Sequence, residues 1–407
     1  MQLKKSLFII SSAVMLSATM PAAMAASEKH IVIAPQCLLD TANITFKTLS
    51  TKKTLRLIEV DDAGIQQLAA NKHKSKTLCG GFMDVTRDWQ NKNALVHLTP
   101  ASFLDSYKLE KVTPAKKVEY KIQHEKETEN VLKTINPQNM WTNLTTLTSF
   151  KDRYANSKTG VAAAEWIKQQ VETMAKETGH TDVTVYYVAT GNWKQPSVVA
   201  KVGNSNEPGI VIGGHMDTLN ASFGNMPGAD DDGSGSVTVM ETARTILASG
   251  VHFNKPIYFI WYSAEEMGLV GSDYVVADFK KKHIPVAAAL QLDMDGYAPH
   301  YDTDPTMWLV TDYVNKDLTA FLEKLITTYV KKPYKFTKCG YACSDHASWY
   351  QGGVASAFPF ESKFNEDDPY IHSANDKMEA LELRHMTDYL KLATAFAVEL
   401  AEPVSKK

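Results

Sequence analysis

The pattern of apolar and polar residues changes once along the chain and divides it into two parts. In the first part, from about Ser27 to Leu104, short runs of alternating character surround one helical pattern at 63–73, which predicts a small α+β unit. The stretch 108–130 is rich in Lys and Glu and poor in apolar residues. It is typical of an exposed linker, and we expect a helix to take up its last part.

Beyond this linker the pattern becomes an alternation of strands and helices. Several predicted strands are continuous apolar runs, which indicates strands covered on both faces. The strands are predicted at 183–189, 197–202, 209–214, 256–262, 286–292 and 307–311. Helical spacing recurs between them, as in 234–249 and 316–330, and a last helix is predicted to end near Glu402. The predicted fold class is therefore α/β, with a mixed, mostly parallel central sheet and helices on both faces.

The bulk composition limits the classes of partner. The chain has 407 residues, 44% of them hydrophobic, and a formal net charge of −3. This length is sufficient for one large domain and a small one. The near balance of charge, without a long basic run, argues against nucleic acid as a partner.

The N-terminus has the organisation of a secretory signal peptide. Lys4 and Lys5 precede an apolar run of moderate length, and the sequence AMA at 23–25 provides a cleavage site of small residues. A membrane anchor is the alternative, but the run is short for a span and contains serines and Pro21. We expect residues 1–25 to be removed and the mature protein to be secreted, with passage through a periplasm and without a membrane anchor.

The four cysteines fit this export. An even number of cysteines in an oxidising compartment suggests disulfides, although the sequence does not fix the pairing. Proximity favours a Cys339–Cys343 bond, which leaves Cys37 for Cys79. Buried free thiols are the alternative.

Side chains that can bind metals follow directly after three of the predicted strands. His215, the segment 263–266 and Asp293 each stand at the end of an apolar run. Ligands bind at the carboxyl ends of strands in open α/β sheets, so this coincidence favours a site at one edge of the sheet.

Each of these features also has a purely structural explanation. His215 alone is compatible with a half-buried histidine, the segment 263–266 fits a capping box that opens a helix, and Asp295-Gly296 fits a turn. The three aspartates at 230–232 fit a calcium loop or a solvated turn. Together, however, clustered carboxylates and imidazoles are best neutralised by a divalent metal, and a mixed His and carboxylate set favours zinc.

Seven motifs, taken in order, resemble those of the secreted bacterial leucyl aminopeptidases that carry a co-catalytic pair of zinc ions. The resemblance covers about Val131 to Glu402, and CGYACSDHASW and PFESKF are its most specific parts. The motifs are GGHMDT, PGADDDGSG, AEEMGLVGS, LQLDMD, CGYACSDHASW, FPFESKFN and IHSANDK. The resemblance implies a zinc-dependent exopeptidase.

The resemblance also implies two zinc ions per chain and a set of ligands. Asp231 would bridge both ions, with His215 and Asp293 completing one and two further residues the other. Asp217 would orient His215 by accepting its other ring proton, and the Asp231–Asp232 peptide bond would be cis. The implied metal ligands are His215, Asp231, Glu266, Asp293 and His372.

Further roles are carried over in the same way. Glu265 would act as the general base, taking the proton as a metal-bridging hydroxide attacks the scissile carbonyl. Tyr341 would donate a hydrogen bond to the oxyanion, with its loop held by the Cys339–Cys343 bond. An apolar pocket implies a preference for leucine-like N-terminal residues, while Asp295 either faces the turn or shifts the preference toward basic residues. The implied pocket residues are Met294, Val310, Cys343, Phe360 and Phe364.

Three alternative functions remain at this point. One is a glutaminyl cyclase with a single zinc, another is an inactive binding ectodomain on the same scaffold, and the third is a carboxypeptidase or endopeptidase with similar metals. The complete ligand set and Glu265 argue against the first two. We expect a monomer whose partners are peptides with a free N-terminus and its own propeptide.

The position of the N-terminal part, ahead of a secreted peptidase, predicts that propeptide. We expect it to comprise residues 26–115, to assist folding and to cover the active site. Its removal is expected between about Tyr107 and Lys126, and the catalytic domain is expected to comprise residues 116–407.

Overall fold

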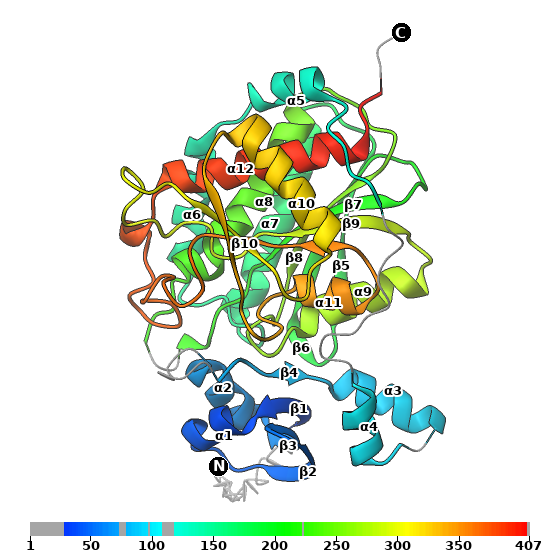
Figure 1. Ribbon diagram of the computed structural model, residues 1–407, viewed down its shortest axis with the longest axis vertical. Coiled ribbons are helices and arrows are strands. Elements are labelled where there is room, and N and C mark those ends of the chain that lie inside the picture. The colour runs from blue at the N-terminus through cyan, green and yellow to red at the C-terminus, as the bar shows by residue number, and fades with distance from the viewer. Residues whose placement is uncertain (1–27, 73–78, 97, 108–117, 222–223, 405–407) are drawn as a thin grey trace, which may run out of the picture.

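The protein is described here by a computed structural model that places residues 28–72, 79–96, 98–107, 118–221 and 224–404. The predicted signal peptide lies outside these residues. Two units follow one another along the chain and lie one above the other in Figure 1: an N-terminal unit, residues 28–107, and a C-terminal unit, residues 118–404. Within the described part of the chain, no helix is long and apolar enough to cross a membrane.

The N-terminal unit is an α+β unit, as the sequence predicts. Its sheet is antiparallel and has the order β2-β3-β1-β4, with β1 paired along its whole length to β3. Its elements are β1 (Lys29–Pro35), α1 (Gln36–Ala42), β2 (Lys47–Lys52), β3 (Leu55–Asp61), α2 (Asp62–Asn71), β4 (Met83–Asp84), α3 (Thr86–Val96) and α4 (Pro100–Ser106). A Cys37–Cys79 disulfide joins α1 to the segment before β4.

His30 connects three elements of this unit. It is buried on β1, with Nδ1 2.8 Å from Asp84 of β4 and Nε2 3.0 Å from Asp62 of α2. Burial alone disfavours a charged imidazole, but the bonds to Asp84 and Asp62 outweigh it and raise the pKa of His30 to about 9.

The C-terminal unit contains the predicted mixed sheet, in the order β12-β9-β7-β8-β6-β5. Strands β12, β9, β7 and β8 run parallel to one another, while β6 pairs antiparallel with both β8 and β5. The strands are β5 (Val183–Thr190), β6 (Trp193–Val202), β7 (Gly209–His215), β8 (Ile257–Tyr262), β9 (Val286–Gln291) and β12 (Ser356–Ala357). The sheet is therefore mostly parallel, as expected.

The predicted strand at 307–311 does not join this sheet. It is β10 (Met307–Val310), the middle strand of a separate sheet in which it pairs with β11 (Tyr334–Thr337) and β13 (Pro359–Phe360). Both of its edges are hydrogen-bonded there, and the short β12 takes the place beside β9 instead. An apolar run predicts a buried strand but carries no information about which sheet receives it.

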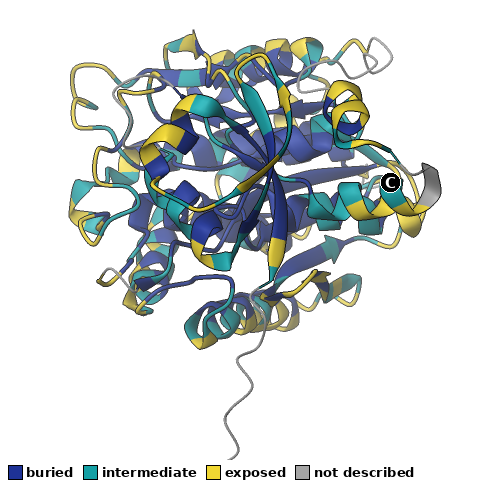
Figure 2. Cartoon of the chain, turned by 90° about the horizontal axis from the view of Figure 1, so that it is seen from below, coloured by how far each residue is buried: buried dark blue, intermediate teal, exposed yellow. Residues whose placement is uncertain are grey.

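Helices cover both faces of the central sheet because its strands are apolar on both sides. On β8, Phe259 and Trp261 face one apolar cluster, whereas Tyr258 and Ile260 face another. The first cluster includes residues of α5 (Glu125–Leu132), α6 (Pro137–Ser149), α7 (Lys158–Glu177), α8 (Gly235–Ala248), α10 (Lys316–Leu325) and α12 (Leu383–Ala401). The second includes α9 (Val270–Lys281) and α11 (His346–Gln351). Figure 2 shows buried positions in the interior and exposed ones on the outer turns.

We predict that the N-terminal unit loses stability between neutral and alkaline pH through His30. Its pKa of about 9 lies above the ordinary 6.5, so the protonated ring stabilises the fold fully below pH 6.5. That stabilisation disappears as the pH rises through 9. The difference in melting temperature between the wild type and His30→Gln should be largest near pH 6 and shrink toward pH 10. An exposed histidine, His300, provides the control substitution, and a pH-independent His30 difference would contradict the prediction.

Candidate active site

Three strands of the central sheet end at the same edge. Parallel pairing of β7 with β8 places His215 opposite Tyr262. The backbone N–H of Leu292, after β9, donates to the carbonyl of Gly213 at 2.7 Å. The polar residues that follow each strand are therefore neighbours, which is the arrangement that the apolar runs predict.

Asp231 lies at the centre of this cluster, between two histidines. Its Oδ1 is 3.1 Å from His215 Nε2 and its Oδ2 is 3.0 Å from His372 Nε2. On one side, Asp293 Oδ1 lies 3.6 Å from His215 Nε2; on the other, Glu266 Oε2 lies 3.0 Å from His372 Nε2. The atoms that can bind a metal form two groups, one of His215, Asp232 and Asp293 and one of Asp231, Glu266 and His372. Asp231 connects the groups, because its Oδ1 also lies 3.1 Å from His215 Nε2.

Of the three consecutive aspartates, Asp232 also lies close to His215 and Asp293. Its oxygens, however, accept hydrogen bonds from backbone: Oδ2 from His215 N at 3.0 Å and Oδ1 from Gly235 N at 2.9 Å. Asp230 Oδ1 similarly accepts from Gly296 N at 3.0 Å. Asp231 is therefore the aspartate that offers an oxygen to both histidines. The peptide bond between Asp231 and Asp232 is cis, as expected.

Two residues that the sequence analysis did not single out hold this loop. Asp376 accepts from Asp230 N at 2.7 Å and from Asp231 N at 3.2 Å. The buried Arg153 donates to the carbonyls of Pro227 and Gly228. Asp376 belongs to the motif IHSANDK, so the motif could have indicated it, whereas Arg153 stands in no motif.

Gly228 permits the turn that leads into the loop. Its φ is +54°, in the left-handed region. A Cβ at this position would also lie 2.4 Å from Thr218 Cγ2 and 2.7 Å from the Arg153 guanidinium. Any larger residue would therefore displace the contacts that position Asp231.

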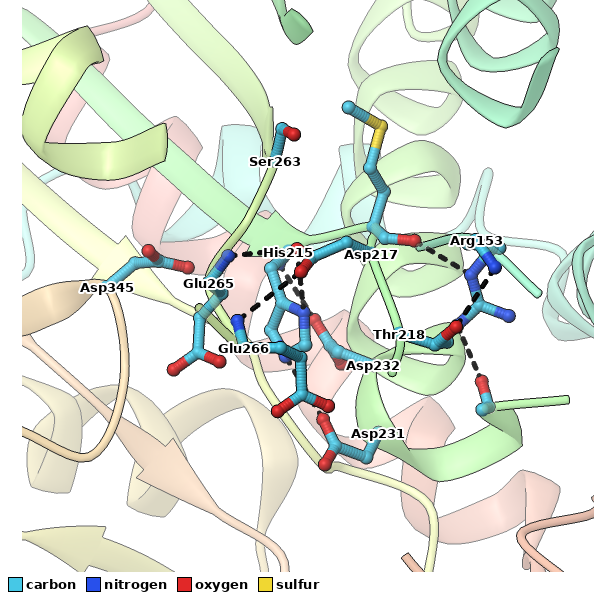
Figure 3. A network of polar contacts seen from close by, with 12 residues as sticks. Arg153, His215, Asp217, Thr218, Asp231, Asp232, Ser263, Glu265, Glu266 and Asp345 are labelled. Carbon is cyan, nitrogen blue, oxygen red and sulfur yellow. Dashed lines mark hydrogen bonds and ion pairs between the residues drawn. The ribbon is translucent and has the colours of Figure 1, made fainter. Parts of the chain in front are cut away.

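Asp217 ties the histidine strand to the two glutamates. Its Oδ1 lies 3.5 Å from His215 Nδ1 and accepts from Glu265 N at 3.0 Å, while Oδ2 accepts from Glu266 N at 3.3 Å (Figure 3). One buried carboxylate thereby orients the imidazole of His215 and the backbone that carries both glutamates.

The segment 263–266 is not a capping box. Ser263 donates its hydroxyl hydrogen to the carbonyl of Gln195 at 2.9 Å, and α9 begins only at Val270. Positive φ values at Ala264 and Leu269 keep the intervening backbone irregular. The segment matches the S-x-x-E pattern, but the side chain of Glu266 points at His372 and does not cap a helix terminus.

The adjacent glutamates have opposite electrostatic surroundings. Burial opposes ionisation of Glu266, but His372 and Lys72 overcome it and lower the pKa of Glu266 to about 2. For Glu265, burial outweighs the attraction of Lys72 and raises the pKa well above its ordinary value. Burial likewise disfavours charge on His372, but Glu266 and Asp231 raise its pKa to about 9. The cluster thus favours positive charge between its carboxylates.

The donor set fits a divalent metal. Imidazole nitrogens and carboxylate oxygens alternate around two points, and buried carboxylates at this density need a cation. Such a mixed set of nitrogen and oxygen donors suits zinc. Asp217 Oδ1, 3.5 Å from His215 Nδ1, occupies the place of the outer carboxylate that metal-bound histidines usually have.

A small pocket of about 20 Å³ lies at the cluster and is lined by both charged and apolar residues. Met294, Cys343, Phe360 and Phe364 line it, while Val310 is fully buried in the same apolar cluster. The other lining residues are Lys72, His215, Asp231, Glu265, Asp293, Tyr341, Phe358 and Asp367. Phe358 and Asp367 were not predicted, because neither differs in type from ordinary core or surface residues.

Tyr341 and Asp295 lie differently with respect to the pocket. Tyr341 stands in the loop closed by the Cys339–Cys343 disulfide and lines the pocket beside Glu265. Asp295 is fully buried next to Ser234, which accepts a hydrogen bond from its backbone N–H, and is not among the lining residues. Asp295 therefore faces the turn and the start of α8.

Lys72, at the end of α2, enters the site from the N-terminal unit. Its Nζ lies 2.9 Å from Glu266 Oε2 and 3.4 Å from Glu265 Oε2. A larger cavity of about 480 Å³ lies at the junction of the two units, beside Tyr341 and the segment 79–83, away from the two histidines. Lys72 carries no signal in the sequence, since one lysine in a surface helix is ordinary.

The fold and the site together define an α/β protein with a metal-binding cluster at the ends of its parallel strands. Comparisons with known proteins specify it further. The pattern of Peptidase family M28 matches residues 197–397. Leucine aminopeptidase 1 of Penicillium rubens is 41% identical in an alignment of 292 residues that covers 69% of this chain and 76% of that protein.

Solved structures agree with this similarity. The LapA aminopeptidase of Legionella pneumophila is 44% identical, with a TM-score of 0.85, over 92% of this chain and 99% of that one. LapB from the same organism is 40% identical, with a TM-score of 0.83, over 92% and 100%. The chain belongs to peptidase family M28 and is a metallo-aminopeptidase.

Proposed function

We propose that this protein is a secreted zinc aminopeptidase that removes leucine-like hydrophobic residues from the N-termini of peptides. The observation that carries the proposal is Asp231, whose two oxygens face His215 and His372 on opposite sides. Glu265 lies in the same pocket but belongs to neither metal-competent set. The relative named Leucine aminopeptidase 1 supports the substrate class.

We propose two zinc ions per chain. His215 and Asp293 would hold one, Glu266 and His372 the other, and Asp231 would be shared. Zinc, when bound, lowers the pKa of a coordinated water and polarises the scissile carbonyl.

Glu265 would serve as the general base. Burial raises its pKa well above the ordinary value of a glutamate, which makes the carboxylate a stronger proton acceptor. It would take the proton of the attacking water and deliver it to the leaving amine. Tyr341 would donate a hydrogen bond to the developing oxyanion, and because burial raises the pKa of Tyr341, its phenol stays protonated for that role.

The cluster of carboxylates also accounts for cleavage at the N-terminus. A free α-amine is positively charged and is attracted to this negative site, whereas an internal peptide bond has no such group. The apolar walls formed by Met294, Phe360 and Phe364 would receive the side chain of the first residue. A glutaminyl cyclase binds one zinc ion, so it would not need all five of the proposed metal ligands.

The N-terminal unit would be the propeptide, residues 26–115, released by cleavage between about Tyr107 and Lys126. Much of that interval, residues 108–117, lies outside the described part of the chain. The disulfide Cys37–Cys79 would stay with the released unit. Export by a signal peptide at 1–25 completes this proposal.

The direct test is hydrolysis of leucyl amide by the processed enzyme. We expect activity on the free amine and none on the amino-blocked analogue, because the site recognises the α-amine. Removal of metal with a chelator should abolish activity, and zinc should restore it. Cleavage of the blocked substrate would instead indicate an endopeptidase or carboxypeptidase.

We predict that substitutions of the two adjacent glutamates have different effects. Glu265→Gln keeps the size of the side chain but cannot accept a proton, so turnover should fall by about 10²–10⁴-fold with zinc retained. Glu266→Ala removes a ligand and should reduce bound zinc together with activity. Zinc content and leucyl amide kinetics would be measured for both variants. A Glu265→Gln enzyme with near-normal turnover, or one that loses zinc, would overturn these roles.

A further inference from the structure

The N-terminal unit places a cation within the proposed metal centre. Lys72 follows the last turn of α2, and only 11% of its side chain is exposed. Its Nζ is 2.9 Å from the same oxygen, Glu266 Oε2, that lies 3.0 Å from His372 Nε2. Lys72 of the N-terminal unit and His372 of the C-terminal unit therefore contact the same oxygen of Glu266.

This insertion is supported by contacts of the residues that follow Lys72 in the chain. Gly81 packs so closely against Tyr341 that a Cβ would lie 2.6 Å from the ring, and the N–H of Asp84 donates to the carbonyl of Gly268 at 3.1 Å. Arg87 makes a two-point ion pair with Asp273 of α9. The segment after α2 thus lies on both the tyrosine and the backbone that follows the glutamates.

The ammonium group of Lys72 and a metal ion at this point would compete for the negative charge of Glu266. A zinc ion bound by Glu266 and His372 would carry positive charge beside Lys72, and like charges in a buried site repel strongly. Lys72 also lies 3.4 Å from Glu265, the proposed base. The docked unit therefore affects the metal ligand and the base through one side chain.

We infer that docking of the N-terminal unit and zinc binding at the Glu266–His372 half of the centre are mutually antagonistic, with Lys72 as the competing cation. This inference rests on the proposed function and adds a regulatory mechanism to it. The uncleaved chain holds zinc weakly at this half, and release of the unit raises the affinity. By reciprocity, zinc weakens docking by the same factor.

The test compares zinc binding by uncleaved full-length chains. Lys72→Met should bind the weaker zinc about 5–150-fold more tightly than the wild type, the usual range of a coupling between sites. Lys72→Arg keeps the charge and should resemble the wild type, which separates charge from packing. Lys47→Met, at an exposed position on β2 of the same unit, is the matched control. Affinities would be measured by competition with a chelator of known zinc affinity.

The outcomes separate this inference from the proposed function. Equal zinc affinities of the wild type and Lys72→Met overturn the antagonism, whatever the activity. Amide exchange in the segment 79–84 adds an independent measurement, since zinc should increase exchange in the wild type and change it little in Lys72→Met. If the processed, zinc-loaded enzyme fails to cleave leucyl amide, the proposed function fails instead.

A different observation carries a second inference, on the far side of the fold from Lys72. His180 and Asp182 lie in the turn between α7 and β5, and His252 lies in the turn between α8 and β8. His180 Nδ1 is 2.9 Å from Asp182 Oδ1, and His252 Nδ1 is 3.8 Å from Asp182 Oδ2. One ligand atom from each residue falls within 4.8 Å of the others.

The hydrogen bonding of His180 favours a cation here. Its Nε2 lies 3.1 Å from the carbonyl of Leu247, which can only accept, so Nε2 carries a hydrogen. Its other nitrogen, Nδ1, lies 2.9 Å from Asp182 Oδ1, so an imidazole nitrogen and a carboxylate oxygen face one another at a point that His252 also reaches. A backbone carbonyl on the far nitrogen is the partner that orients metal-binding histidines.

We also propose that His180, Asp182 and His252 form a peripheral site for zinc that joins the two turns. At zinc concentrations that saturate the active site, the wild type should bind one ion more per chain than His252→Ala and melt at a higher temperature. Turnover of leucyl amide should be unchanged, because the site is separate from the reacting groups. His300→Ala, at an exposed position, is the control. Equal zinc content in wild type and His252→Ala overturns this site.

Discussion

The structure depends on how it accommodates carboxylates that are crowded at one edge of a sheet. Those nearest His215 and His372 include seven that are at most 6% exposed. They are Asp217, Asp230, Asp231, Asp232, Glu265, Glu266 and Asp293. Buried like charges raise the free energy of a fold unless each meets a donor or a cation. The chain meets this constraint in two ways, by hydrogen bonds from backbone N–H groups to some of the acids and by histidines that face the others.

Some of the acids accept backbone hydrogen bonds, and others face imidazoles. Burial raises the pKa of Asp230 and of Asp232 well above the ordinary value, and both accept from backbone N–H groups. Burial also opposes charge on Asp231, but His215 and His372 reverse the effect and lower its pKa well below that value. Three identical residues in a row thus acquire different chemistry from their surroundings, because Asp376 and Arg153 fix which one points at the histidines.

Much of this could be predicted from the sequence because it follows from local periodicity. Strands that are apolar on both faces end where His215 and Asp293 begin, and parallel pairing brings those ends together. The sheet that receives β10 could not be predicted, since apolar content does not encode partner choice. The capping role of Ser263 was wrong for a related reason: S-x-x-E describes four residues, whereas the role of Glu266 is set by His372, over a hundred positions away. Contacts between units, such as Lys72, leave no local pattern at all.

Lys72 helps to compensate the negative charge of these buried carboxylates. A cluster that favours positive charge is satisfied by any cation that reaches it, and a lysine from the N-terminal unit reaches Glu266 at 2.9 Å. The ammonium lowers the pKa of Glu266 together with His372, so it stabilises the ionised form that a metal also requires. A covering segment with a neutral side chain at this point would leave the carboxylates without that compensation. The negative charge that suits the site to a metal and to an α-amine therefore also provides the attraction that holds the N-terminal unit in place.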